Sequence, residues 1–126
     1  MVLLDTNIII EVYKNNRLII NEIERIGEEN ICISVITAGE LLYGALNRQE
    51  LSFIRKNLKT ITNIKIDGII CDKFIEIMDA YSLSHNLKIP DGLIAATALV
   101  YDIPIYTLNL KDFKPIKGIQ LHQTLT

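Results

Sequence analysis

Short apolar runs alternate along this chain with longer segments of helical periodicity, and this alternation constrains the fold more than any other feature. Residues 2–4 (VLL) and 31–34 (ICIS) are runs of the kind seen in buried parallel strands. Weaker runs occur at residues 64–66 (IKI) and 103–108 (IPIYTL). Strands and helices in alternation predict an α/β sandwich with a mainly parallel central sheet.

The segments between these runs have apolar residues at helical spacing. Residues 17–26 place four isoleucines on one face and end at Gly27. Residues 69–87 repeat the pattern, and Pro90 then predicts the start of another helix. The three prolines all fall at boundaries of the pattern, so we expect residues 1–126 to form a single domain.

Composition narrows the range of functions. The net charge of -2 differs from the strongly basic balance of sequence-reading DNA-binding domains. The hydrophobic fraction of 49% is high for a small domain and hints that a partner covers some apolar surface. Cys32 and Cys71 have no metal-site spacing and are expected to be buried and reduced. No run spans a bilayer, so we expect a cytoplasmic protein without a membrane segment.

Four acidic residues lie in or beside apolar stretches, close to a predicted strand end or helix start: Asp5, Glu40, Asp91 and Asp112. The other acidic residues, such as those of residues 21–30 (NEIERIGEEN), are expected on polar helix faces where water solvates them. Ligands of open α/β sheets bind beyond the carboxyl ends of the strands, and Asp5 stands at such an end.

Each of the four acids also has a purely structural interpretation. Asp5 would cap a helix that begins at the next residue. Glu40 follows Thr37 at the spacing of a capping box. Asp91 suits the first turn of a helix and its dipole, and Asp112 suits a turn. Both interpretations stand at this point.

A cation would explain why four carboxylates gather at one edge of a sheet. Ionised acids repel one another in a pocket of low dielectric unless protons or cations neutralise them. Oxygen ligands favour Mg²⁺ or Mn²⁺. His85 is expected to cap the end of a helix and His122 to lie in a weakly ordered tail, which argues against zinc.

Four motifs resemble a known family in order and spacing. They are LLDTN (residues 3–7), SVITAGELLYGA (34–45), IPDGLIAATALVYDIPIYTLNLKDF (89–113) and IKGIQL (116–121). This set resembles the PIN-domain ribonucleases, and its length and style are similar to the VapC toxins of prokaryotic toxin–antitoxin pairs. The resemblance implies a doubly wound three-layer α/β/α sandwich, a single PIN-like domain over residues 1–126 and metal-dependent endonuclease activity on RNA.

The resemblance also assigns roles to residues. It carries catalytic and metal-binding roles to Asp5, Glu40 and Asp91. Many relatives have an acid where this chain has Asn109, so the fourth role is transferred to Asp112, three residues later. Polar support around the metal is expected from Thr6, Asn7, Thr107 and Asn109.

Hydrolysis of a phosphodiester requires an activated water and stabilisation of the developing negative charge, and a bound Mg²⁺ or Mn²⁺ supplies both. Basic side chains then need only guide the flanking RNA backbone. One group of candidates aligns as a stripe on a helix: Arg48, Arg55 and Lys59. The other group, Lys111 and Lys114, flanks the fourth acid. A solvated charged face is an equally simple explanation for these residues.

The partners implied by the resemblance are an RNA substrate, a second copy of the chain in a homodimer and a cognate antitoxin whose tail reaches the acidic pocket. Two other functions are compatible with the sequence. One is a PIN-like module that binds RNA or protein without cutting. The other is a Mg²⁺-dependent phosphoaspartate enzyme or receiver, although such proteins require a second acid near the first strand, where this chain has Asn7.

Overall fold

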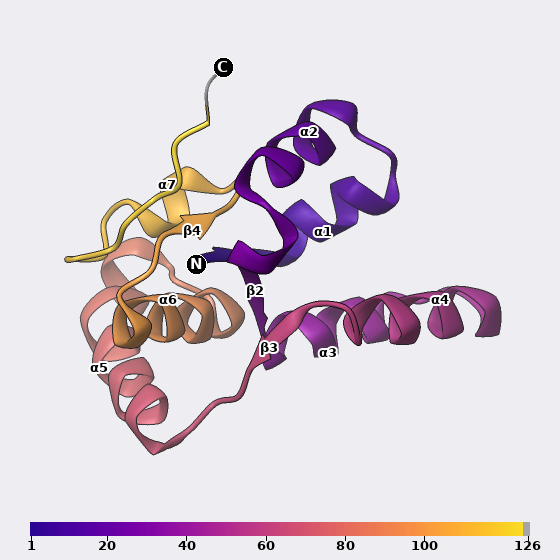
Figure 1. The fold of residues 1–126 in the computed structure, drawn as a ribbon. Helices are drawn as coiled ribbons and strands as arrows, with labels where there is room; N and C mark the ends of the chain where they lie inside the picture. The colour runs from indigo at the N-terminus through magenta and orange to yellow at the C-terminus, as the bar shows by residue number, and fades with distance from the viewer. Residues whose placement is uncertain (125–126) are drawn as a thin grey trace.

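The computed structural model describes residues 1–124 as alternating strands and helices (Figure 1). In chain order the elements are β1 (Val2–Leu4), α1 (Thr6–Tyr13), α2 (Arg17–Ile26), the 3₁₀ turn η1 (Glu28–Asn30), β2 (Ile31–Ser34), α3 (Val35–Tyr43), α4 (Arg48–Leu58), β3 (Thr62–Ile64), α5 (Gly68–His85), α6 (Ile89–Tyr101), β4 (Ile105–Tyr106) and α7 (Leu110–Phe113).

The four strands form one parallel sheet in the order β3-β2-β1-β4. The chain starts at β1, moves outward through β2 to β3, and then returns to the other side of β1 for β4. The strand order therefore reverses at β1, as in doubly wound folds. The carboxyl ends of β1, β2 and β4 all meet at one edge, where ligands of such sheets bind.

Alternating side chains of the strands divide the core into two layers. Leu3 and Cys32 pack with the apolar faces of α5 and α6. Leu4 and Ile33 point to the other face, where α1 to α4 supply the packing residues. Because successive residues of a strand point to opposite sides, three-residue strands suffice to join both layers. The fold is a three-layer α/β/α sandwich, as predicted.

The predicted elements agree with the structure except at two places. The third strand, at residues 62–64, begins two residues before the IKI run (64–66) and overlaps it only at Ile64. His122, expected in a weakly ordered tail, belongs to a segment that runs beside β4: the Ile105 N–H donates to the Gln120 carbonyl at 2.9 Å, and the His122 N–H donates to the Ile105 carbonyl at 2.8 Å. These backbone bonds order the segment.

Two further expectations concern cysteines and membrane segments. Cys32 and Cys71 are both free, and Cys32 is buried as expected. The expectation of burial is wrong for Cys71, which is exposed on α5 because its position lies off the apolar face of that helix. Among residues 1–124, no helix combines the length and the apolar character that crossing a membrane requires.

Candidate functional site

Asp5 stands directly after β1 at the edge where the strand ends converge. Its N–H donates to the Tyr106 carbonyl of β4 at 2.9 Å, which fixes the residue between two strands. Its carboxylate accepts hydrogen bonds from the Thr6 N–H at 2.7 Å, the Thr107 hydroxyl at 2.7 Å and, more weakly, the Asn7 amide at 3.3 Å. Asp5 is thus the N-cap of α1 and, at the same time, a buried carboxylate only 4% exposed.

Glu40 reaches the same edge from α3. Its Oε1 accepts a hydrogen bond from the Thr6 hydroxyl at 2.7 Å, and the Thr37 hydroxyl lies 3.0 Å from that of Thr6. The capping-box interpretation of Glu40 is wrong. The N-cap of α3 is Ser34, so the helix begins at Val35 and Thr37 is a buried residue of its first turn.

Asp91 lies in the first turn of α6 and is partly buried. Burial raises the pKa of its carboxyl to about 6, and the negative charges of Asp5, Asp112 and Glu40 add to the increase, while Lys88 opposes it. Burial also raises the pKa of Asp5, with a further contribution from Glu40, although the hydrogen bonds from Thr107 and Thr6 counteract it. The four predicted acids therefore share one electrostatic environment.

The fourth acid enters from α7. Asp112 is exposed, and its N–H donates to the Asn109 carbonyl at 3.1 Å. The Asn109 N–H in turn donates to the Thr107 hydroxyl at 2.9 Å. Asn7 joins the same loop, because its Oδ1 accepts from the Leu108 N–H at 3.2 Å. Of the predicted supporting residues, Thr6, Asn7 and Thr107 contact carboxylates, whereas Asn109 contributes through its backbone.

The donor set suits a hard divalent cation. Every candidate ligand is a carboxylate oxygen, and three carboxylates raise the pKa of the fourth, so a cation would relieve a repulsion that is already present. Within residues 1–124, however, no three Asp, Glu, His or Cys side chains are arranged closely enough to ligate one ion. Asp5 and Glu40 instead accept hydrogen bonds from hydroxyl and amide donors.

The basic candidates lie in two separate places. Lys111 and Lys114 are exposed on and just after α7, next to the fourth acid. Arg48 and Arg55 are exposed on α4, which Figure 1 shows on the opposite side of the molecule from α7. Lys59 follows α4 and precedes β3, so it lies toward the amino end of that strand, at the edge of the sheet remote from the carboxylates. The structure therefore does not bring the two basic groups together.

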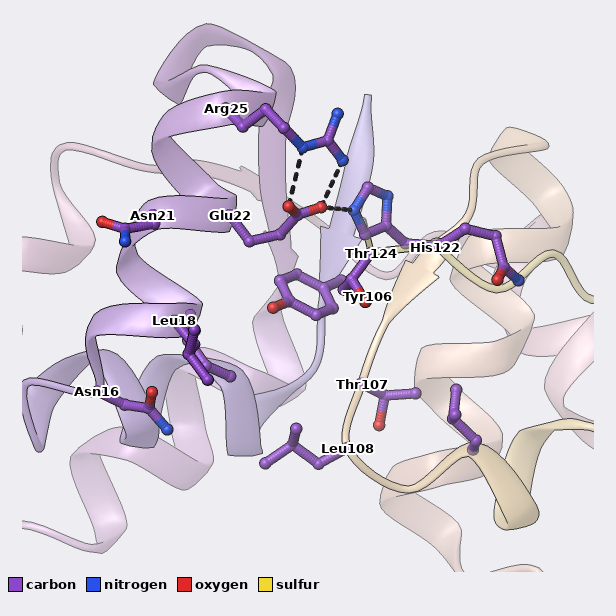
Figure 2. A pocket seen from close by; sticks show the side chains of 13 residues that line it. Asn16, Leu18, Asn21, Glu22, Arg25, Tyr106, Thr107, Leu108, His122 and Thr124 are labelled. Atoms are coloured by element: carbon purple, nitrogen blue, oxygen red, sulfur yellow. Dashed lines mark hydrogen bonds and ion pairs between the residues drawn. The ribbon is translucent and has the colours of Figure 1, made fainter. Parts of the chain in front are cut away.

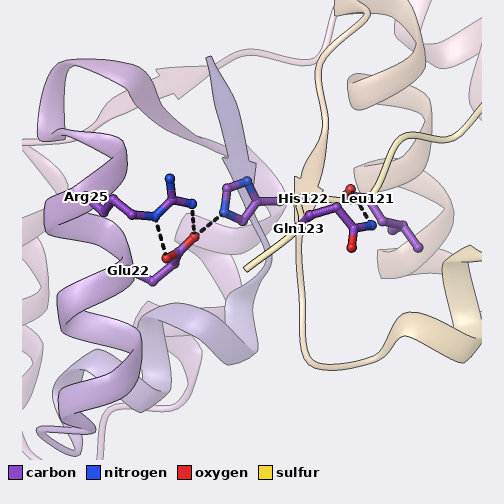
Figure 3. A network of polar contacts seen from close by, with 5 residues as sticks. All are labelled: Glu22, Arg25, Leu121, His122 and Gln123. Atoms are coloured by element: carbon purple, nitrogen blue, oxygen red, sulfur yellow. Dashed lines mark hydrogen bonds and ion pairs between the residues drawn. The ribbon is translucent and has the colours of Figure 1, made fainter. Parts of the chain in front are cut away.

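A second polar cluster was missed by the sequence analysis. Glu22, in the segment expected to be solvated, is only 8% exposed. Its carboxylate accepts the Arg25 Nε–H at 2.9 Å, and its Oε2 lies 2.6 Å from His122 Nε2 (Figure 3). These contacts, chiefly with Arg25, lower the pKa of Glu22 to about 2. The available signal was its position three residues after Ile19, on the apolar face of α2.

This cluster forms one wall of a cavity of about 770 Å³ between α2, β4 and the C-terminal segment (Figure 2). Thr107, which donates a hydrogen bond to Asp5, also lines the cavity. The cavity therefore adjoins the acidic site.

Comparison with known proteins gives a consistent result. The PIN-domain family matches residues 2–117. Ribonuclease VapC1 of Rickettsia felis is 33% identical over 94% of this chain and 92% of its own length. Ribonuclease VapC1 of Methanocaldococcus jannaschii is 29% identical over 95% of this chain and 84% of its own length.

Solved structures share the fold as well. A toxin–antitoxin complex from Klebsiella pneumoniae contains a chain with a TM-score of 0.81 and 31% identity, and the match covers 94% of this chain and 95% of that one. The DNA-bound VapBC complex of Salmonella typhimurium contains a chain with a TM-score of 0.86 and 25% identity, with 96% of each chain covered. The family match over residues 2–117 includes all four strands and the candidate site.

Proposed function

The chain belongs to the PIN-domain family, as its motifs predicted, and from this premise we propose that it is a metal-dependent endoribonuclease and the toxin of a VapBC-type toxin–antitoxin pair. The observation that carries the proposal is the electrostatic coupling of Asp91 with Asp5, Glu40 and Asp112 at the carboxyl edge of a parallel sheet. The relatives named ribonuclease VapC support the substrate class, and the VapBC complexes support the pairing with an antitoxin.

We assign the metal-holding role first to Asp5, which is buried directly after β1, and to Asp91, which is partly buried in the first turn of α6. Glu40 would ligate the ion directly or through water and orient the attacking water, and Asp112 would assist with that water or with a second ion. When bound, Mg²⁺ or Mn²⁺ would supply the activated water and the charge stabilisation that phosphodiester hydrolysis needs.

The hydroxyl and amide groups around the acids act as positioning residues in this scheme. Thr107 and Asn7 hold one oxygen of Asp5, and the Thr6 hydroxyl holds Glu40. Each contact restricts a carboxylate rotamer, which lowers the cost of assembling the ligand set. Lys111 and Lys114 are placed to attract the RNA backbone on the α7 side, whereas the stripe formed by Arg48, Arg55 and Lys59 is more remote.

The proposed partners are RNA, a cognate antitoxin and a second copy of the chain, with residues 1–126 forming one domain that acts in the cytoplasm. Large apolar side chains are strongly exposed at Tyr43 and Leu46, at and just after the end of α3, and such surface is usually covered in a complex. An antitoxin that carries a basic side chain into the acidic site would replace the charge of the metal and silence the enzyme.

The test is cleavage of cellular RNA by purified protein in Mg²⁺, Mn²⁺ or EDTA, with two matched variants. Asp5→Asn and Asp67→Asn both replace the aspartate that caps a helix, since Asp67 caps α5 by accepting the Ile70 N–H at 2.9 Å. Asn caps a helix about as well as Asp, so both proteins should fold.

We expect cleavage in the presence of metal, none in EDTA, and a loss of at least about 100-fold in Asp5→Asn only, because a neutral ligand binds a hard cation weakly. Cleavage by Asp5→Asn at the wild-type rate, or cleavage that persists in EDTA, would overturn the proposal.

A further inference from the structure

The cavity between α2, β4 and the C-terminal segment is lined by groups that the proposed reaction does not use. At about 770 Å³ it falls within the size range of small-molecule pockets. Figure 2 shows that Leu18 of α2 and Leu108, just after β4, both line the cavity although they belong to different elements. Thr107 belongs to both the cavity and the acidic site, so a ligand in the cavity would lie beside the carboxylates.

The walls of the cavity combine apolar side chains that are open to solvent with amide groups. Leu18 is 73% exposed, Leu108 53% and Leu110 44%. All three line the cavity, although Leu18 is about 90 residues from the other two in the chain. Asn21 lies on the same helix as Leu18, and its side-chain amide also lines the cavity. A ligand with apolar faces and hydrogen-bonding edges would satisfy both kinds of group.

The charges in the cavity are already balanced. Among residues 1–124, Glu22 is the one carboxylate that lines the cavity, and Arg25 and His122 pair with that group. The His122 ring also packs against Tyr106, with ring centroids 5.0 Å apart. The cavity therefore offers a ligand little net charge, in contrast to the neighbouring acidic site.

We propose that this cavity binds an unpaired nucleobase of the RNA, next to the phosphodiester bond that is cut. The inference rests on the proposed function and specifies its substrate: RNA that is single-stranded at the site, with one base inserted between Leu18 and Leu108. Sequence-selective RNA recognition generally uses unpaired bases, because their faces and edges are accessible.

Other ligand groups fit the cavity less well. A phosphate would require an excess of positive charge, but the charge of Arg25 is taken up by Glu22. A basic peptide side chain would be drawn to the carboxylates next door rather than to a neutral cavity. A flat neutral base matches the apolar walls and can use the amides at their edge.

The test measures RNA binding separately from cleavage. Fluorescence anisotropy would measure binding of an unstructured 12-nucleotide RNA and of a set of variants of it. Each variant carries a single abasic residue at a different position, and every RNA is measured in Ca²⁺ and in EDTA. The proteins are the wild type, Leu18→Ser and the control Leu83→Ser. Leu83 is 98% exposed on α5, so the control makes the same change on a surface outside the cavity.

We expect an abasic residue at one position to weaken binding to the wild type about tenfold, as the loss of one stacked or buried base typically does. Leu18→Ser should weaken binding of the intact RNA about fivefold or more, and it should abolish most of the abasic penalty. Leu83→Ser should behave as the wild type.

Equal binding of all RNAs by the wild type and Leu18→Ser would overturn the inference and leave the cavity to a peptide side chain. The same holds if the wild type binds no RNA at all, in which case the proposed function also fails. If the wild type binds RNA with the abasic penalty but cuts none, the nucleobase site stands and the endonuclease proposal falls.

Discussion

Among single residues, Asp91 has a carboxyl group whose ionisation the fold opposes. Its pKa of about 6, against an ordinary value of 3.8, means that the folded protein favours the protonated form. Below pH 3.8 the group is protonated in both the folded and unfolded states and has no net effect on stability. Between pH 3.8 and about 6 the unfolded chain releases this proton while the folded protein retains it, so the group increasingly destabilises the fold, and above about pH 6 the destabilisation is complete and constant.

We therefore expect Asp91→Asn to stabilise the metal-free protein at pH 8 by about 1–2 kcal/mol and to have little effect at pH 4. The full shift would correspond to about 3 kcal/mol, and partial exposure of the group reduces it. Urea unfolding in EDTA at both pH values measures the difference. Asp79→Asn, an exposed position on α5, serves as the control. Equal stabilisation at pH 4 and pH 8 would contradict the electrostatic explanation.

The acids also show what a single sequence can predict about a site. For Asp5 the prediction of a helix cap is confirmed, and the cap uses only one of its two carboxylate oxygens. Its Oδ1 accepts the Thr6 N–H as a cap does, while its Oδ2 binds the Thr107 hydroxyl. Local spacing singled out four acids, and the charges of Asp5, Glu40 and Asp112 all act on Asp91 in the folded protein. Local spacing could not identify their hydrogen-bond partners, because Thr6 and Glu40 are 34 positions apart, and Asp5 and Thr107 are 102 apart.

At the scale of elements, buried strands and long amphipathic helices were predictable because their signal is local. The β1 and β2 strands consist almost entirely of apolar residues, and α5 and α6 follow helical periodicity up to clear boundary residues. The position of β3 was mispredicted by two residues, because it is an edge strand whose Thr62 and Asn63 are exposed and polar. Polar residues on an edge strand protect it from further pairing.

The ordered position of His122 in the C-terminal segment (residues 120–122) was not predicted from the sequence. The order of this segment depends on the main-chain bonds to Ile105 and on the contact of His122 with Glu22, 100 residues earlier in the chain. No local pattern reports such a contact. The buried pair ties the segment to α2 and closes one side of the cavity.

We expect His122→Ala to destabilise the protein by about 1–2 kcal/mol, since one hydrogen bond to a charged group and the contact with Tyr106 are lost. The amide of Ile105, which donates to Gln120, should exchange its hydrogen faster, while the amide of Leu3, which donates to Pro104, should change little. Hydrogen-exchange mass spectrometry or NMR measures both.

His85→Ala is the matched control, because His85 is exposed in the last turn of α5. Its ring contacts only neighbours on the same helix, Ser84 and Tyr81. If exchange at Ile105 is the same in His122→Ala, His85→Ala and the wild type, the contact with Glu22 does not hold the C-terminal segment in place.

At the scale of the whole molecule, the three-layer arrangement brings four acidic side chains to one edge of a small sheet. Asp5 caps α1 and Asp91 lies in α6, and these two helices belong to different layers. Glu40 lies in α3 and Asp112 in α7. Repulsion among them is a cost of the folded state only, because the unfolded chain keeps them apart. A cation that binds the folded state alone should therefore stabilise the entire domain.

We expect Mg²⁺ or Mn²⁺ at about ten times its dissociation constant to stabilise the wild type by about 1.4 kcal/mol and to raise its Tm by about 3–6 °C. Differential scanning calorimetry with a metal titration against EDTA measures this shift. Asp5→Asn should lose most of the response relative to its own Tm in EDTA, because asparagine retains the cap through its oxygen but its amide nitrogen cannot ligate a cation. Asp67→Asn should respond as the wild type. An equal response in all three proteins would mean that the metal binds outside the carboxylate site, and no response in any of them would remove the metal from the proposed function.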